Sequence, residues 1–229
     1  MPQEFPMQAI AHIHSDFSSK FGVPRQSGLV DSLEATIVFE PPYRNPDALR
    51  GLEGFSHLWL IWEFSENKNN SPSLTVRPPR LGGNTRMGVF ATRSPFRPNF
   101  LGLSCVEITK IDYEDKNAPV IYVTGADIMD NTPIFDIKPY IPFTDSRPEA
   151  KGGFSEDVFS DCLTVEFSSE ALADIKEEDI PVLTKLLSGD PRPHYHNDPE
   201  RVYAFEFSCY KIKFTVRENV LTVNEIIVL

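Results

Sequence analysis

The segment 57-HLWLIWEF-64 decides the class of fold. It is apolar along nearly all of its eight residues. About four to eight residues suffice for a buried strand, whereas a helix in a core is usually longer than about ten. The segment is therefore predicted to be a buried β-strand. Similar short segments, rich in β-branched and aromatic residues, lie at 7–15, 33–40, 86–92, 101–113, 119–127 and 132–142.

Turns rather than long helices separate these segments, apart from a brief helix or turn expected at 46–52. Twenty prolines and seventeen phenylalanines also argue against a helical bundle. Several short strands at this spacing are typical of an antiparallel barrel or sandwich. Residues 1–143 are therefore predicted to form a mainly β domain.

The rest of the chain has a different pattern. Residues 144–159 are polar, contain glycine and proline, and are predicted to be a linker. Residues 160–229 are predicted to be a small α+β domain, with a strand at 162–167, a helical segment at 168–189 and a three-stranded meander at 202–229. The helical segment is expected to begin at an N-cap, Ser168 or Ser169, and to end at Gly189; 217–219 should form the second turn of the meander.

Composition and motifs argue against several classes of protein. No apolar run approaches the ~20 residues that span a bilayer. The N-terminus lacks the basic region followed by an apolar region that is typical of a secretory signal. Three widely spaced cysteines indicate reduced thiols in a cytoplasmic protein. Five histidines have no cysteine or carboxylate partners at ligand spacing, so no metal site is predicted. Nucleotide-binding glycine motifs and a nucleophile elbow are absent.

The distribution of charge predicts an anion site. The formal net charge is -11, which disfavours non-specific binding to nucleic acid. Between Glu66 and Glu107, however, there is no acidic residue, while one lysine and five arginines supply six positive charges. An ordinary solvated loop would mix the two signs and use lysine more often. We therefore expect this arginine-rich segment, residues 67–106, to bind an anion.

Part of this segment, 91-ATRSPFRPNFLGLS-104, is predicted to be a stiff loop. Its prolines restrict the backbone beside Arg93 and Arg97. An arginine on a rigid backbone loses less conformational entropy when it grips an anion or a planar base. We expect Arg97 to find such a partner outside its own segment. The structural alternative is that Arg97 braces an acidic residue such as Asp127 or Asp136.

Four segments carry a resemblance to a known family: GLEGFSHLWLIWEF (51–64), VRPPRLGGNTRMGVFATRSPFRPNFLGLS (76–104), DNTPIFDIKPYIPF (130–143) and DPRPHY (190–195). They resemble the TrmO family of S-adenosylmethionine-dependent tRNA methyltransferases, and the resemblance covers nearly the whole chain. Two departures are visible. Phe100 stands where the family pattern PNPIG has its second proline, which is expected to loosen the loop slightly, and His194 stands where alanine is more usual.

The resemblance implies a fold and a function. The family methylates N6 of the threonylcarbamoyl-adenosine at position 37 of certain tRNAs, next to the anticodon. It implies a single-sheet antiparallel β-barrel as the cofactor-binding domain, residues 1–143, and a C-terminal domain, residues 160–229, that assists tRNA binding. It also implies S-adenosylmethionine as cofactor and a homodimer. We therefore expect the barrel alone to bind the cofactor. The residues themselves predict a cytoplasmic protein with no membrane partner and no metal.

The four segments, together with VPRQS (23–27) and GADIMDN (125–131) of the barrel, supply the candidate site residues that the resemblance implies. A sulfonium is attracted to carboxylates and aromatic faces, a carboxylate to arginine, and adenine to an apolar slot. The candidates for cofactor binding are Arg25, Gln26, Ser27, Glu63, Phe64, Arg93, Leu103, Asp127, Ile128 and Asp130. The candidates for tRNA contact are Arg77, Arg80, Arg86, Arg97, Asn99, Arg192 and Tyr195. No catalytic acid or base is assigned, because methyl transfer depends mainly on positioning.

Simpler roles stay open for some of these residues. Arg25 can brace its own loop, Asp127 and Asp130 can cap turns, and His57 can be a hydrogen-bonded structural residue. Two other functions stay open as well: a non-enzymatic RNA-binding module, and a methyltransferase with a different substrate. Cofactor binding separates the first from an enzyme, and a requirement for tRNA separates the second.

Overall fold

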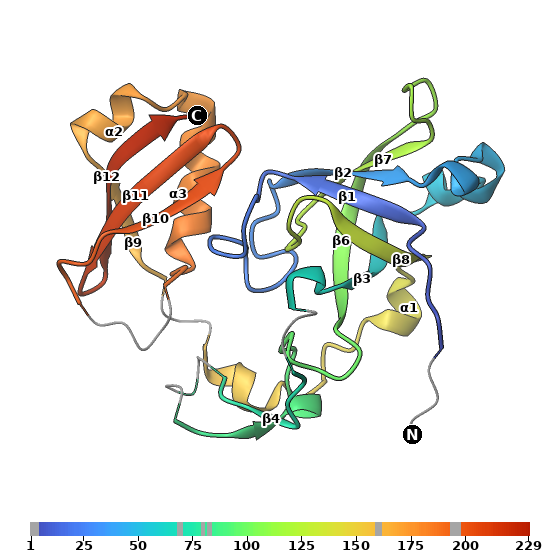
Figure 1. Cartoon of the computed structure of the whole chain (residues 1–229), viewed down its shortest axis with the longest axis horizontal. Coiled ribbons are helices and arrows are strands. Elements are labelled where there is room, and N and C mark those ends of the chain that lie inside the picture. Colours follow the sequence, from blue (N-terminus) through green and yellow to red (C-terminus); the bar gives the residue numbers. More distant parts are fainter. Residues whose placement is uncertain (1–4, 68–70, 79–80, 82–83, 159–161, 193–197) are drawn as a thin grey trace.

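The computed structural model describes residues 5–67, 71–78, 81, 84–158, 162–192 and 198–229. The chain forms a β-barrel and a smaller α+β domain that lie side by side, the latter in orange and red in Figure 1. No helix within the described ranges has the length and apolar character needed to cross a membrane.

Six antiparallel strands close into a barrel in the order β1-β2-β7-β6-β3-β8. They are β1 (Ala11–Ser15), β2 (Glu34–Phe39), β3 (His57–Glu63), β6 (Leu101–Asp112), β7 (Val120–Thr124) and β8 (Thr132–Pro139). Closing a single sheet on itself leaves no unpaired edge. The predicted single-sheet antiparallel barrel is confirmed.

Strand β3 shows why its sequence is apolar on both faces. Leu58, Leu60 and Trp62 point into the barrel core and are buried. On the outer face, the indole nitrogen of Trp59 donates a 2.9 Å hydrogen bond to Asp145, which belongs to the short helix α1 (Pro142–Asp145). The inner face of the strand is therefore buried, as predicted, whereas the outer face is only half-buried.

The arginine-rich segment leaves the barrel as a short arm. Its strands β4 (Thr75–Val76) and β5 (Met87–Gly88) pair with each other at the bottom of Figure 1. The strand predicted at 86–92 is wrong beyond Gly88, because Val89–Ala91 form a 3-10 helix. The amide and the hydroxyl of Thr92 both donate to the carbonyl of Val89, which closes this turn.

The C-terminal domain is a four-stranded sheet with helices packed against it. Its elements are β9 (Thr164–Phe167), α2 (Ser169–Ala173), α3 (Ile180–Ser188), β10 (Tyr203–Phe207), β11 (Tyr210–Arg217) and β12 (Val220–Val228). Ser168 is the N-cap of α2, as predicted, and accepts a 3.1 Å bond from the amide of Ala171. The predicted helical segment is divided in two. Pro181, which lacks an amide proton, lies in the first turn of α3.

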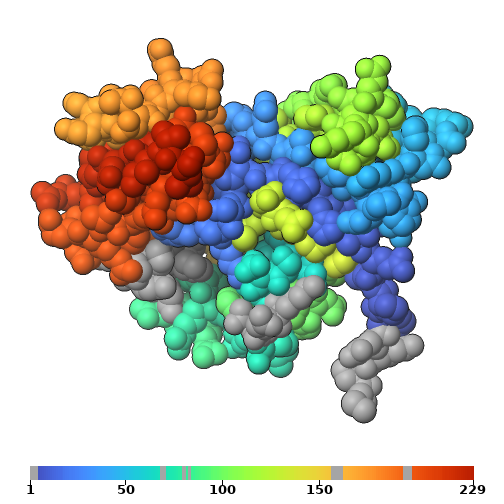
Figure 2. Space-filling view, turned by 45° about the horizontal axis from the view of Figure 1, so that its top comes forward, coloured from blue at the N-terminus to red at the C-terminus, as the bar shows by residue number. Residues whose placement is uncertain are grey.

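The long connection between β1 and β2, called here the β1–β2 loop (residues 16–33), does not pack on the barrel core. Its side chains Phe17, Val30 and Leu33 are buried in the core of the C-terminal domain. Figure 2 shows this blue part of the chain pressed against the orange and red domain. The sequence predicted that all of residues 1–143 belong to the barrel domain. In the structure, side chains of this loop belong to the core of the C-terminal domain instead.

Candidate active site

A cavity of about 820 Å³ lies between the β1–β2 loop, the barrel and the arginine-rich segment. Its walls come from residues within 20–26, 61–67, 90–99, 101–103 and 127–132. Sites for small molecules usually have volumes of about 300–1,000 Å³, so the cavity has room for a nucleoside cofactor. Three of the four segments that carry the family resemblance, 51–64, 76–104 and 130–143, contribute to it.

A chain of hydrogen bonds crosses from the barrel core to the cavity wall. The indole nitrogen of the buried Trp62 donates to Ser104 Oγ at 2.9 Å. Ser104 Oγ in turn donates to Asp127 Oδ1 at 2.5 Å. Because Trp62 and Ser104 are fixed by packing and by their positions on adjacent strands, the carboxylate of Asp127 is held in one orientation.

Burial is the largest influence on the pKa of the Asp127 carboxyl and raises it above its ordinary value. The hydrogen bond from Ser104 and the charge of Arg93 act in the opposite direction but offset only part of this rise. A carboxylate with a raised pKa, on the wall of a cavity, is a common feature of functional sites. The carboxyl group of Asp127 is therefore suited to a ligand that is cationic or that donates a hydrogen bond.

Two arginines of the stiff loop, Arg93 and Arg97, also line the cavity. Arg93 donates to Gln26 Oε1, so the arginine-rich segment is tied to the β1–β2 loop at the cavity lining. Arg97 Nη1 donates to the carbonyls of Thr92, at 3.1 Å, and Ser94, at 3.4 Å. Arg97 therefore braces its own loop, which differs from the expected partner outside its segment. The two structural alternatives pair elsewhere, Asp127 with Ser104 and Asp136 with Lys138.

Arg97→Ala is expected to leave the melting temperature of the protein nearly unchanged, because the lost bonds are partly exposed and local to one loop. The same change should weaken binding of the cavity's ligand about five- to tenfold, since Arg93 lies on the loop that Arg97 braces. Thermal melts and calorimetry on one preparation would check both expectations. A large fall in melting temperature with unchanged ligand affinity would contradict them.

The departure at Phe100 changes the backbone more than the expected slight loosening. Phe100 has φ 51, a left-handed conformation, and its amide donates to the carbonyl of Arg97 at 3.2 Å. Proline can adopt neither feature, because its ring holds φ near about -65° and it has no amide proton. This chain therefore closes the loop in a way that the family's proline cannot reproduce.

Most of the predicted cofactor residues meet at the cavity. Its lining includes Arg25, Gln26, Glu63, Phe64, Arg93, Leu103 and Asp127. Three do not belong to it. Ser27 Oγ accepts from the amide of Cys105 at 3.1 Å, Ile128 is buried in the barrel core, and Asp130 contacts His14 at 3.1 Å. For Ile128 the reason is the alternation along the chain: its neighbours Asp127 and Met129 line the cavity, whereas Ile128 is buried in the core.

The predicted tRNA contacts have different surroundings. Arg77 and Arg86 are exposed on the arm, where Arg86 donates to Thr75 Oγ1 at 2.7 Å, and Arg97 and Asn99 line the cavity. Arg192 differs from the expectation of an available charge: both Nε and Nη2 donate to the carboxylate of Asp190 at 2.9 Å. Its charge is neutralised within the protein. Arg80 and Tyr195 lie outside the described residues.

Sequence reasoning missed several residues of the site, namely Lys20, Trp62, Phe90, Ser104 and Met129. Ser104 carried a signal that was overlooked. It lies between Gly102 and Val106 at the inward-facing positions of β6, where an apolar residue is expected. A hydroxyl at such a position needs a buried partner. Lys20, which donates to the carbonyl of Glu66 at 3.2 Å, carried no comparable signal.

Asp127→Asn is expected to raise the melting temperature at about pH 7.5. Because the folded-state pKa of Asp127 is raised above its unfolded value, the folded state binds the proton more tightly. Stability is therefore lost as the pH rises from the unfolded pKa through the folded one, and asparagine removes that loss. Melts across the pH range should show the difference shrinking toward about pH 4. A variant that is less stable at neutral pH would contradict the burial argument.

Comparisons with known proteins place the chain in a family. The model of the tRNA-methyltransferase O N-terminal domain matches residues 12–146, and that of the TrmO C-terminal domain matches residues 160–228. The chain belongs to the TrmO family. It is 39% identical over 222 residues to the tRNA (adenine(37)-N6)-methyltransferase of Escherichia coli strain K12, which covers 93% of this chain and 94% of that protein.

Other relatives agree. The tRNA (adenine(37)-N6)-methyltransferase of Eikenella corrodens is 38% identical over 173 residues, 75% of this chain and 97% of its own. A crystal structure of TrmO from Pseudomonas aeruginosa superposes with a TM-score of 0.81 at 28% identity and covers 100% of this chain and 99% of that one. The family, the fold and the methyltransferase class predicted from the sequence are confirmed.

Proposed function

We propose that this protein transfers a methyl group from S-adenosylmethionine to N6 of adenosine 37 of tRNA, beside the anticodon. We further propose that the nucleoside is threonylcarbamoyl-adenosine and that the reaction takes place in the cytoplasm. The observation that carries the proposal is a cavity of cofactor size, with arginines on one wall and the carboxylate of Asp127 on another, in a chain of the TrmO family. The names of the bacterial relatives support the tRNA position, and the family resemblance supports the threonylcarbamoyl group.

The residues of the cavity fit the parts of S-adenosylmethionine. Leu103, 55% exposed on the cavity side of the barrel, and Met129 offer apolar surface for an adenine. Arg93 suits the amino-acid carboxylate, and Asp127 suits a hydroxyl or a positive charge. When bound, the cofactor supplies an electrophilic methyl group on its sulfonium. The protein's part is to hold the reactants in line and to exclude water, for which the fixed orientation of Asp127 and the stiff loop of Arg93 are suited.

The arm supplies the proposed surface for tRNA. Arg77 and Arg86 are exposed on it and suit contacts to the phosphate backbone, which position a nucleic acid without reading its bases. Asn99, on the cavity lining, is placed to meet a nucleotide that enters the site. Because the chain as a whole carries a net charge of -11, we expect the phosphate backbone of tRNA to be attracted only to this region.

We expect a homodimer in solution. Leu74 and Phe90 are each 75% exposed and Phe96 is 41% exposed, all on the arginine-rich segment. Large apolar side chains gathered on one exposed arm are typical of an interface. Light scattering at micromolar concentration should give twice the mass of the chain, and Phe90→Ser combined with Leu74→Ser should shift the mass toward the monomer. A monomer mass for the wild-type protein would refute this expectation.

Transfer of a labelled methyl group from S-adenosylmethionine to tRNA tests the proposal. Label in the tRNA fraction is the expected result. Binding of tRNA with neither cofactor binding nor transfer would favour a non-enzymatic RNA-binding module. Cofactor binding with no transfer to any tRNA would favour a methyltransferase with a different substrate.

A further inference from the structure

The β1–β2 loop packs into the core of the C-terminal domain on one side and lines the cavity on the other. On one side, Phe17 contacts Phe207 with ring centroids 5.4 Å apart, and Phe21 stacks on Phe214 at 6.4 Å with an interplanar angle of 13°. The backbone approaches just as closely. A Cβ added at Gly22, where φ is +100, would lie 2.3 Å from a ring carbon of Phe205. This side of the loop is part of the C-terminal core.

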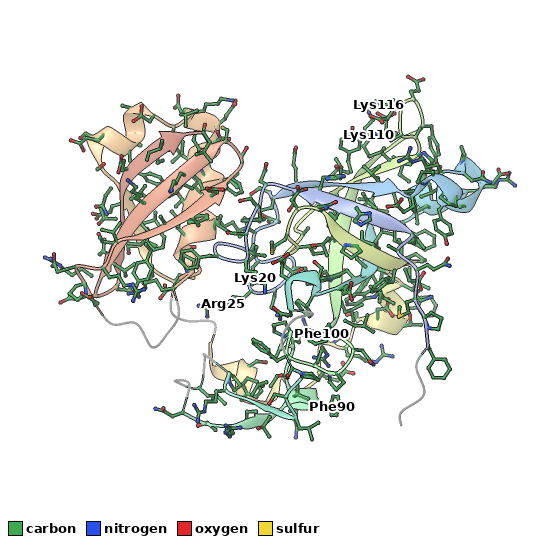
Figure 3. The ribbon with its side chains drawn as sticks, in the orientation of Figure 1. Lys20, Arg25, Phe90, Phe100, Lys110 and Lys116 are labelled. Carbon is green, nitrogen blue, oxygen red and sulfur yellow. The ribbon has the colours of Figure 1, made fainter. Side chains whose placement is uncertain are left out.

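On its other side the same loop forms a wall of the cavity. Lys20, Val23, Pro24, Arg25 and Gln26 all line it. Gln26 accepts from Arg93 of the arginine-rich segment, and the loop returns to the barrel through a 2.9 Å bond from Gly28 N to the carbonyl of Gly125. Figure 3 shows Lys20 and Arg25 between the two domains. The wall is therefore held between the barrel domain and the C-terminal domain, and contacts with both can set its position.

Arg25 makes the polar contact between the wall and the C-terminal domain. Its Nη2 donates to the carbonyl of Asp190 at 2.7 Å and to that of Arg192 at 3.3 Å. The acceptor turn is braced from within, because the carboxylate of Asp190 accepts from the backbone amide of Arg192 at 3.2 Å and from both Nε and Nη2 of its guanidinium. Asp190 itself has φ 48, a conformation that aspartate tolerates better than most residues. The two carbonyls are thus held in fixed positions for Arg25.

We propose that Arg25 is a positioning residue: by binding the carbonyls of Asp190 and Arg192 it fixes the cavity wall formed by residues 23–26, so that the C-terminal domain is an integral part of the cofactor site. This inference rests on the proposed binding of S-adenosylmethionine in the cavity. It replaces the expectation that the barrel of residues 1–143 binds the cofactor alone. A C-terminal domain that only held tRNA would have no influence on cofactor affinity in the absence of tRNA.

Calorimetric titration of the full-length protein with S-adenosylmethionine, without tRNA, tests the inference. Arg25→Ala is expected to weaken binding about tenfold, because it removes the donor of the contact. Asp190→Ala is expected to weaken binding about fivefold, because it keeps the acceptor carbonyl but removes the carboxylate that holds the turn in place. The double variant should bind about as Arg25→Ala does, rather than about fiftyfold more weakly than the wild type, because the two changes are not independent. Arg25→Lys can still reach one carbonyl and should restore part of the affinity.

Lys185→Ala is the matched control. Lys185 also ties the β1–β2 loop to the C-terminal domain, through a 2.5 Å contact with Asp31, but neither residue lines the cavity. It should bind S-adenosylmethionine like the wild type. Thermal melts accompany each variant, and Asp190→Asn, which suits the same backbone conformation, replaces Asp190→Ala if that variant does not fold.

The outcomes separate the ideas. Wild-type affinity in the Asp190 variants, with weak binding in Arg25→Ala, would mean that Arg25 acts on the ligand directly, and would overturn the inference. An equal loss in Lys185→Ala would overturn it too, because any loosening of the domains would then suffice. No binding by the wild-type protein would refute the proposed function as well.

Discussion

Arg93→Ala is expected to lower kcat/KM for methyl transfer about a hundredfold while leaving the melting temperature within about 2 °C of the wild type. Arg93 is exposed, so its removal opens no cavity in the core. Its charge acts on Asp127 and its guanidinium donates to Gln26, so it contributes both to the charge of the site and to the contact between the arginine-rich segment and the β1–β2 loop. Initial rates and thermal melts on one preparation would measure both effects.

Arg86→Ala is the control for this prediction. Arg86 is an exposed arginine of the same segment, but it lies on the arm and does not line the cavity. Its removal should weaken tRNA binding by removing one phosphate contact and reduce its dependence on salt, with unchanged affinity for S-adenosylmethionine. Equal losses in the two variants would show that the segment contributes only overall charge. A fully active Arg93→Ala variant would remove Arg93 from the site.

Gly102→Ala should destabilise the protein by about 2–3 kcal/mol, which lowers the melting temperature by roughly 5–10 °C. A Cβ at this position would lie 2.3–2.6 Å from three ring atoms of Trp62. The ring cannot easily move aside, because Trp62 is buried and its nitrogen is bonded to Ser104. The clash should also disturb Asp127, so ligand binding is expected to fall together with stability.

Gly54→Ala provides the comparison, because nothing lies within 4 Å of a Cβ added there. Its stability should differ from that of the wild type by no more than about 0.5 kcal/mol. Chemical denaturation of both variants would give the two free energies of unfolding. If Gly102→Ala were as stable as Gly54→Ala, that result would contradict the close packing of the Trp62 ring against Gly102 of β6.

The barrel could be predicted from the sequence because its strands carry local signals. The segment 57-HLWLIWEF-64 is too short and too apolar for a solvent-covered helix, and it became β3. The strand order around the barrel could not be predicted, since it depends on pairings between distant segments such as β1 with β8. The strand expected at 86–92 failed because the side-chain and backbone bonds of Thr92 favour a turn.

The candidate site was predictable to a similar degree. Arg25, Arg93 and Asp127 were predicted because their segments match a family pattern, and the structure brings the three residues to one cavity. The packing of Phe17 and Phe21 into the other domain left no local signal, because a loop in sequence can be core in space. The pairing of Arg192 with Asp190 was visible only in the structure, although the residues are two positions apart.

Mass spectrometry of tRNA nucleosides tests the central claim most directly. tRNA that carries threonylcarbamoyl-adenosine at position 37 would be incubated with the purified protein and methyl-labelled S-adenosylmethionine, beside the same tRNA with unmodified adenosine. We predict the labelled methyl group on N6 of the modified nucleoside at position 37, and none in reactions with Arg93→Ala carried to the same short time. Label on a different nucleoside, or no label in tRNA from a protein that binds the cofactor, would contradict the account.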